Sequence, residues 1–170
     1  MLFDFFDIYK MRKLVLYTLL LLVLLFFQNS VCSRIRIWGV SAMFMPAAAV
    51  CIGLLESGMK GAAFGLVAGI FCDIAYPESV LLFTILLPIL GFLAGMIAEF
   101  FINRRFFAYI VLSVPALLIT AFCQMFRLLV FTETGLFALL PTALLQVWWS
   151  LPLAILLYFP CKALAAFAKE

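Results

Sequence analysis

Six long apolar runs dominate this chain, and they constrain its fold more than any other feature. Charged and turn-forming residues separate the runs, which cover residues 14–31, 37–55, 61–75, 80–101, 106–126 and 142–159. A helix that crosses the hydrocarbon core of a bilayer needs about 20 mostly apolar residues. The sequence therefore predicts an all-α membrane protein, a polytopic bundle of six transmembrane helices that forms one domain over residues 1–170.

The composition excludes a water-soluble domain of this length. Hydrophobic residues make up 69% of the chain and charged residues 11%, whereas soluble domains average roughly 45–50% and about 25%. The net charge of +3 comes with basic residues that stand singly or in pairs between apolar runs. We therefore expect no nucleic-acid partner and interpret the basic residues as markers of membrane topology.

These basic residues are divided unequally between the two ends of the predicted helices. Eight fall on the side of both termini: Lys10, Arg12, Lys13, Lys60, Arg104, Arg105, Lys162 and Lys169. Three fall on the other side: Arg34, Arg36 and Arg127. Because positive residues concentrate in cytoplasmic segments, we expect both termini in the cytoplasm. We expect residues 14–31 to be an uncleaved first span, since Val31 is a poor residue to precede Cys32 in a lipoprotein-type cleavage site.

Two stripes of small residues stand out among the apolar runs. Gly61, Gly65, Gly69 and Asp73 follow each other at four-residue steps, so they share one face of the third predicted helix. A second, shorter stripe lies on the fourth predicted helix: Gly91, Gly95 and Glu99. Helices in lipid associate through close packing and polar contacts, which small residues permit. The stripes predict helix contacts, either with each other inside the bundle or with a partner protein.

Asp73 ends the longer stripe near the predicted outer end of its helix. One interpretation is that it terminates the helix ahead of Pro77, which disfavours the helical conformation in the residue before it. The other is that its carboxylate accepts hydrogen bonds from a neighbouring helix or from the outer segment with Arg34 and Arg36, because an unpaired acid in a membrane is costly. The sequence leaves both interpretations open.

The fifth predicted helix carries a polar face. Ser113, Thr120, Gln124 and Arg127 are separated by steps of seven, four and three residues, so they lie on one side of the helix. This face predicts either the lining of a hydrated pocket or a seam of hydrogen bonds between helices.

Aromatic residues with polar atoms mark the sixth predicted helix. Trp148 and Trp149 lie within the run, and Tyr158 lies near its end. Such residues often anchor a helix at the membrane interface, and packing against other helices is the alternative.

The residues that membrane enzymes need are missing from the sequence. There is no histidine, which excludes a Ser/His catalytic pair and the common metal motifs. Asp73 has no second aspartate within a predicted span, and no phosphate-binding loop is present. The five cysteines are far apart and lack C-x-x-C spacing. We therefore expect no enzymatic activity, no cofactor and no metal site.

One stretch of the chain resembles a known family. The segment from Gly61 to Asp73, a short loop and a helix with Gly91-Phe92-Leu93-Ala94-Gly95 resemble the rod shape-determining protein MreD family. The length, the six short-looped spans, the basic N-terminus and the pair Arg104-Arg105 are similar too. The likeness is closest over residues 58–105.

The resemblance implies a non-catalytic scaffold of the cell-elongation complex in the bacterial inner membrane. Such a scaffold regulates cell shape and peptidoglycan synthesis by binding the bitopic protein MreC, with the actin-like MreB and the peptidoglycan synthases. In this chain the third helix, Asp73 and residues 76–79 would form part of that binding surface.

A rival function comes from the fold of the same family. MreD proteins are thought to be similar in fold to the substrate-binding S components of energy-coupling-factor vitamin transporters, whose first helix usually carries an Ala-x-x-x-Ala stripe. Residues 14–21 of this chain contain no alanine. The shape protein is therefore favoured, with the S component as the alternative.

Overall fold

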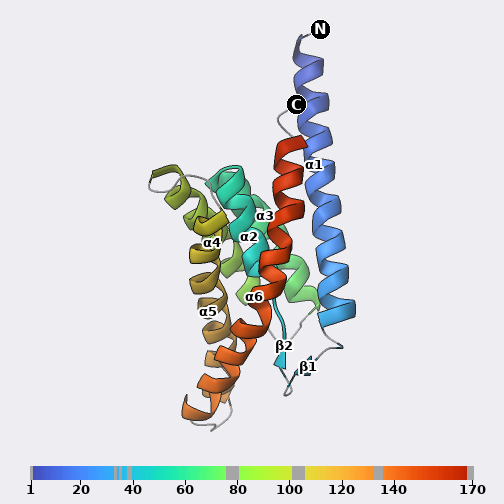
Figure 1. The fold of residues 1–170 in the computed structure, drawn as a ribbon. Helices are drawn as coiled ribbons and strands as arrows, with labels where there is room; N and C mark the ends of the chain where they lie inside the picture. Colours follow the sequence, from blue (N-terminus) through green and yellow to red (C-terminus); the bar gives the residue numbers. More distant parts are fainter. Residues whose placement is uncertain are drawn as a thin grey trace.

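The structure is a computed structural model that describes residues 2–32, 34, 36–37, 40–75, 81–100, 106–131 and 136–167. Nearly all of this part is helical, as the sequence predicts, apart from two short strands that pair antiparallel. The elements in order are α1 (Leu2–Phe27), a π-helical turn η1 (Gln28–Cys32), β1 (Arg36–Ile37), β2 (Val40–Ser41), α2 (Met45–Leu55), α3 (Gly58–Ala75), α4 (Leu82–Phe100), α5 (Phe106–Phe131) and α6 (Leu136–Phe167) (Figure 1).

In the part of the chain that the structure describes, three candidate membrane-spanning helices indicate a membrane protein. α3, Phe106–Met125 of α5 and Leu140–Ala166 of α6 are each long and apolar enough to cross a bilayer. The apolar parts of the other three helices are shorter: Val15–Ser30, Met45–Leu55 and Leu82–Ala98. Helix length alone therefore does not account for the six crossings that the sequence predicts.

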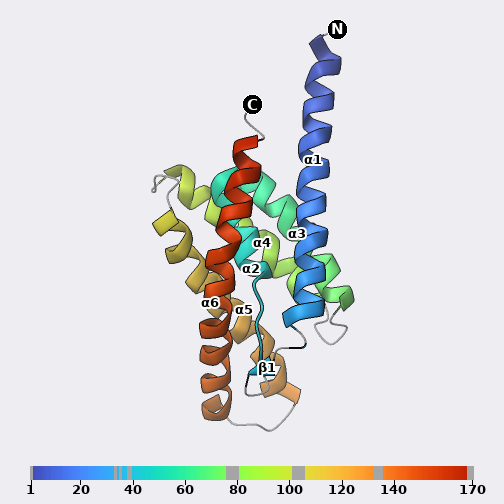
Figure 2. The same cartoon turned by 45° about the vertical axis from the view of Figure 1, so that its right-hand side comes forward.

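The helices form a bundle around α2. α3 packs along α4, α5 packs along α6, and α2 contacts all four of them. α1 begins and α6 ends at the same end of the molecule, and the first turns of α1 extend beyond the other helices (Figures 1 and 2).

α2 is the most enclosed element of the described chain. Every residue from Met45 to Leu54 is buried, and the helix is apolar on all sides. A helix that is hydrophobic all round belongs in a core, and here neighbouring helices surround it.

The prediction of one continuous helix over residues 37–55 is wrong in its first part. Ile37 belongs to β1, Val40 and Ser41 form β2, and residues 42–44 are neither helix nor strand before α2 begins at Met45. Pro46 explains the start, because proline lacks an N–H and is tolerated only in the first turn of a helix. A short apolar run does not distinguish a buried extended segment from a buried helix.

The other boundaries shift without changing the helix order. α1 starts at Leu2, ahead of the expected first span, and α6 starts at Leu136, ahead of residue 142. α5 continues to Phe131, so the stretch 128–141 divides between α5 and α6, with residues 132–135 outside the described part. Three prolines interrupt the hydrogen-bond ladder of α6: Pro141, Pro152 and Pro160.

Candidate functional site

The two glycine stripes face each other where α3 packs on α4. A Cβ on Gly65 would lie 2.6 Å from the carbonyl oxygen of Leu87, and one on Gly61 would lie 2.7 Å from the carbonyl oxygen of Gly91. A Cβ on Gly69 would overlap the backbone of Phe83. Real Cβ atoms do not come so close to backbone, so only glycine allows this approach of the two helices.

Two glycines outside the stripes complete the contact. A Cβ on Gly95 would overlap the backbone nitrogen of Gly58 and lie 2.9 Å from the carbonyl oxygen of Gly53. α2, α3 and α4 thus meet backbone to backbone. Gly61, Gly65 and Gly69 are buried, so these contacts within the chain use the surface that a partner would otherwise take.

Asp73 connects α3 to the start of α4. Its Oδ2 accepts hydrogen bonds from the backbone N–H of Thr84 at 2.8 Å and from the Thr84 hydroxyl at 2.6 Å, and its Oδ1 accepts one from the N–H of Phe83 at 3.2 Å. Helix N-termini present unpaired N–H groups and a partial positive charge, both of which a carboxylate satisfies. Asp73 therefore caps α4 from the neighbouring helix, which is the second of its two interpretations.

The residue before α4 has an unusual backbone conformation. Leu81 directly precedes α4 and has φ of 59°, in the left-handed region that non-glycine residues seldom adopt. α3 itself continues to Ala75, so Asp73 does not end its own helix.

A polar seam holds residues 42–44, which we call the entry segment because they lead into α2. Gln28 donates from Nε2 to the carbonyl oxygen of Ala42 at 2.9 Å, and its Oε1 accepts the N–H of Phe44 at 3.3 Å. Ser150 of α6 accepts the N–H of Met43 at 2.9 Å. Because the entry segment is almost fully buried, these side chains replace the partners that helix or sheet would supply.

Two glutamines extend the seam between α5 and α6. Gln146 donates from Nε2 to Oε1 of Gln124 at 3.1 Å, and Gln124 donates to the sulfur of Met43 at 2.8 Å. The hydroxyl of Ser150 donates to the carbonyl oxygen of Gln146 at 2.7 Å. The seam therefore links the entry segment to α5 and α6.

The predicted polar face of α5 contributes to this seam only in part. Gln124 takes part, whereas the hydroxyls of Ser113 and Thr120 donate to carbonyl oxygens of their own helix, at 3.0 Å and 2.7 Å. Such bonds satisfy a hydroxyl without joining helices. The side chain of Arg127 lies outside the described residues.

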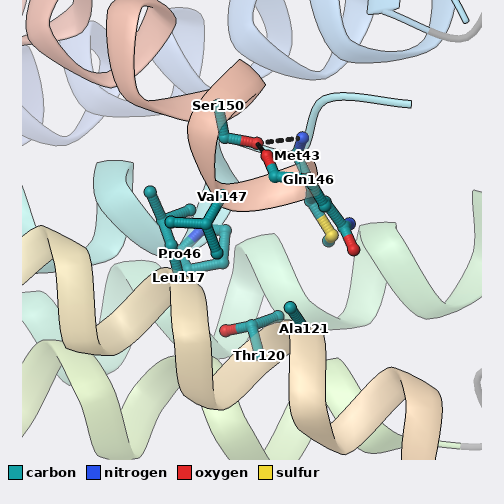
Figure 3. Close-up of a pocket in the computed structure, with 8 residues that line it drawn as sticks. All are labelled: Met43, Pro46, Leu117, Thr120, Ala121, Gln146, Val147 and Ser150. Atoms are coloured by element: carbon teal, nitrogen blue, oxygen red, sulfur yellow. Dashed lines mark hydrogen bonds between the residues drawn. The ribbon is translucent and has the colours of Figure 1, made fainter. Parts of the chain in front are cut away.

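A small cavity lies beside the seam between α2, α5 and α6. Its volume is about 10 Å³, which is the room that one water molecule needs, whereas ligand pockets measure about 300–1,000 Å³. As it stands, this cavity has no room for a vitamin. It is lined by Met43, Pro46, Leu117, Thr120, Ala121, Gln146, Val147 and Ser150 (Figure 3).

A buried acid joins α1 to the turn between α2 and α3. Oε1 of Glu56 accepts the Tyr17 hydroxyl at 2.8 Å, and Oε2 pairs with Nζ of Lys60 at 2.6 Å. The Glu56 side chain is 5% exposed, and that of Lys60 is 56% exposed. This contact ties α1 to the bundle, and Gln28 does the same for the π-helical turn that follows α1.

The aromatic residues of α6 divide between the two interpretations. Tyr158 is buried and packs against Tyr109 and Phe106, with ring centroids 5.3 Å and 5.0 Å away, and Trp149 packs partly buried against the core. Trp148 points outward and is 77% exposed. Packing therefore explains Trp149 and Tyr158, and Trp148 remains available for another contact.

Several of these residues were not singled out by the sequence. Gln146 and Ser150 stand four residues apart on one face of the sixth apolar run, and Glu56 and Lys60 stand four residues apart just before the third. Spacing therefore offered a signal for both pairs. Gln28 offered none, because its partners are backbone groups of a distant segment.

Among the residues that the structure describes, no three Cys, Asp or Glu side chains come together as metal ligands.

Known proteins do not supply a relative for this arrangement. No family model, no curated protein and no solved structure matches the chain. The function is therefore inferred from the residues themselves.

Proposed function

We propose that this chain is a non-catalytic scaffold of the bacterial cell-elongation complex, similar to the rod shape-determining protein MreD. It would act in the inner membrane by binding MreC, with MreB and the peptidoglycan synthases as further members of the assembly. The observation that carries the proposal is the segment Gly61–Asp73 with Gly91 and Gly95. These residues form one structural unit, in which glycines join two helices and Asp73 caps the second.

The scaffold that we propose crosses the membrane six times, with a second crossing that is only half helical. The eleven residues of α2 extend over roughly 16 Å, and the non-helical residues 40–44 add at most roughly 16 Å. Their sum approaches the roughly 30 Å of the hydrocarbon core. Non-helical backbone is tolerated at membrane depth only where protein surrounds and satisfies it, and Gln28 and Ser150 provide this for residues 42–44.

The proposed orientation places both termini in the cytoplasm. Six crossings return the chain to its starting side, and α1 begins at the same end of the bundle as α6 ends (Figure 1). The excess of basic residues on that side supports the cytoplasmic assignment.

One observation favours the S component as a second candidate. Membrane transporters often form substrate sites where a crossing helix is interrupted. Here α2 is preceded by a non-helical segment in which Met43 meets the polar side chains of Ser150 and Gln124. The cavity at this position has only about 10 Å³. An S component would need the entry segment to move before a vitamin could bind.

Capture of MreC tests the proposal. The full chain carries an affinity tag, is expressed in its native host and is extracted in mild detergent, and a tagged six-helix protein of the same membrane serves as the control. We expect MreC with the tagged chain and not with the control, and no small molecule in native mass spectra. A stoichiometric vitamin without MreC would replace the scaffold by the S component.

A further inference from the structure

The helices of this chain differ in the length of their apolar stretches. Leu140–Ala166 of α6 has 27 residues and Phe106–Met125 of α5 has 20, which extend over roughly 40 Å and 30 Å. The apolar part of α4, Leu82–Ala98, extends over only roughly 26 Å. Because the hydrocarbon core of a bilayer is about 30 Å thick, α5 and α6 reach across it and α4 falls short.

α3 is limited by a charged residue near each of its ends. The whole helix has 18 residues and extends over roughly 27 Å, but Lys60 and Asp73 lie within it. The uncharged residues 61–72 between them extend over roughly 18 Å. The neighbouring helix α1 also has a short apolar part, Val15–Ser30. The bundle is therefore shorter in apolar length at α3 and α4 than at α6.

Both short helices present apolar side chains on the surface of the chain. Leu66 and Ile70 of α3 are exposed, and so are Ile85, Ile89 and Leu93 of α4. Where such a surface lies in a membrane, the length of the helices decides how well the lipid chains fit it.

Neither tilting nor snorkelling restores the missing length of α3. Tilting suits a helix that is too long and further shortens the reach of one that is too short. The Lys60 side chain is 56% exposed and can extend its charge toward the headgroups at one end. At the other end the Asp73 carboxylate accepts the N–H groups of Phe83 and Thr84. Asp73 is thus fixed at the start of α4, and its charge is costly in hydrocarbon.

We propose that the bilayer is thinner beside α3 and α4 than beside α6, and that the α3–α4 pair preferentially binds phospholipids with short acyl chains. A bilayer thins around a hydrophobic stretch that is shorter than its core, at a cost that grows with the mismatch. Short acyl chains lower this cost, because a bilayer of such lipids is already thin. Leu140–Ala166 of α6 is long enough to fit a thick bilayer.

The inference rests on one part of the proposed function, the crossings of α3 and α4. It does not depend on MreC or on cell shape. A chain that fails to capture MreC can therefore still show the lipid preference.

Quenching of tryptophan fluorescence by brominated lipids tests the proposal at single positions of the full chain. The α4 reporter is Ile89→Trp in a chain with Trp38→Phe, Trp148→Phe and Trp149→Phe. The α6 reporter keeps Trp148, which is 77% exposed, and loses the other two tryptophans in the same way. Each chain is placed in vesicles that mix a fourteen-carbon and a twenty-two-carbon phosphatidylcholine, with one of the two brominated at a time. Quenching then gives the relative affinity of each position for the two lipids.

We expect the reporter at position 89 to favour the short-chain lipid about twofold, because the cost of mismatch is modest. Trp148 should show no preference for the short chain. Leu93→Trp, one turn further along α4, is a second reporter with the same expectation, and it decides the test if Ile89→Trp does not fold.

Two results would overturn the proposal. The same lipid preference on α4 and α6 would show that the bilayer does not differ between the two helices. No quenching on α4, with quenching at Trp148, would show that lipid does not reach α4, and this result would also count against the proposed crossing.

Discussion

The α3–α4 pair and the entry segment both bury backbone inside the bundle, and they are stabilised in opposite ways. Where α3 meets α4, glycines bring two helix backbones together, so the contact depends on the absence of side chains at these positions. At the entry segment the helix is interrupted, and Gln28 and Ser150 satisfy the free backbone groups, so that contact depends on atoms that are present. The first region is sensitive to added volume and the second to lost polar partners.

This difference also separates what each region offers to a partner. The glycines of both stripes pack against neighbouring helices inside the bundle, although small-residue stripes often mark binding surfaces between membrane proteins. α6 keeps Trp148 exposed. The glycines of the two stripes are therefore not free to contact a partner, whereas the side chain of Trp148 is.

The largest effect is expected from added volume at Gly65. Gly65→Leu places a side chain where a Cβ already lies 2.6 Å from the Leu87 carbonyl oxygen. We expect the free energy of unfolding in detergent to fall by about 3 kcal/mol or more, at the upper end for overpacking. Ala63→Leu, at an exposed site of the same helix, should change it little. Equal effects of the two variants would contradict the glycine contact.

A smaller loss is expected when the entry segment loses its partner on the π-helical turn. Gln28→Leu keeps the volume but leaves the Ala42 carbonyl and the Phe44 N–H buried without Gln28. We expect a loss of about 2 kcal/mol, because unsatisfied buried groups cost about 1–3 kcal/mol. Val23→Leu, exposed on α1, is the control in the same unfolding assay. A Gln28→Leu chain as stable as the control would remove this role of Gln28.

The cap on α4 comes next in size. Asp73→Ala removes three hydrogen bonds to the first turn of α4, and we expect it to cost about 1–2 kcal/mol, as helix caps do. Asp73→Asn keeps one acceptor oxygen and should cost less. Hydrogen exchange of the Phe83 and Thr84 amides measures the effect locally. Unchanged exchange in Asp73→Ala would rule out the cap.

The smallest effect is expected for the contact between Gln124 and Gln146. A double-mutant cycle with Gln124→Leu and Gln146→Leu isolates their interaction, which we expect to be about 0.6 kcal/mol, the average for hydrogen bonds between membrane helices. A coupling near zero would show that the two side chains contribute separately, and that the seam depends on the entry segment alone.

The sequence reveals contacts that repeat along one helix. Gly61, Gly65 and Gly69 recur at four-residue steps, and the packing of α3 on α4 follows the same steps. Asp73 continues the series, so its closeness to another helix could be anticipated. The donors on Thr84 could not, because the position of α4 along α3 is a property of the folded pair.

The sequence does not reveal contacts that join single residues of distant segments. The helical part of residues 37–55 begins only at Met45. The sequence does not reveal this start, because an apolar run is compatible with helix and with buried non-helical chain. Gln28 and Ser150 meet the same segment from opposite ends of the sequence. Trp148 and Trp149 are neighbours in sequence, yet Trp148 is exposed and Trp149 is partly buried. This difference depends on how α6 is rotated about its axis in the folded chain.

Cell shape after depletion tests the proposed scaffold function most directly. The gene is placed under a repressible promoter in its rod-shaped native host, and cell width is measured as the protein disappears. We expect cells to widen into spheres, with rescue by the parent chain and by Ala63→Leu but not by Gly65→Leu. Cells that stay rod-shaped after complete depletion would contradict the proposal that this chain holds the elongation complex together.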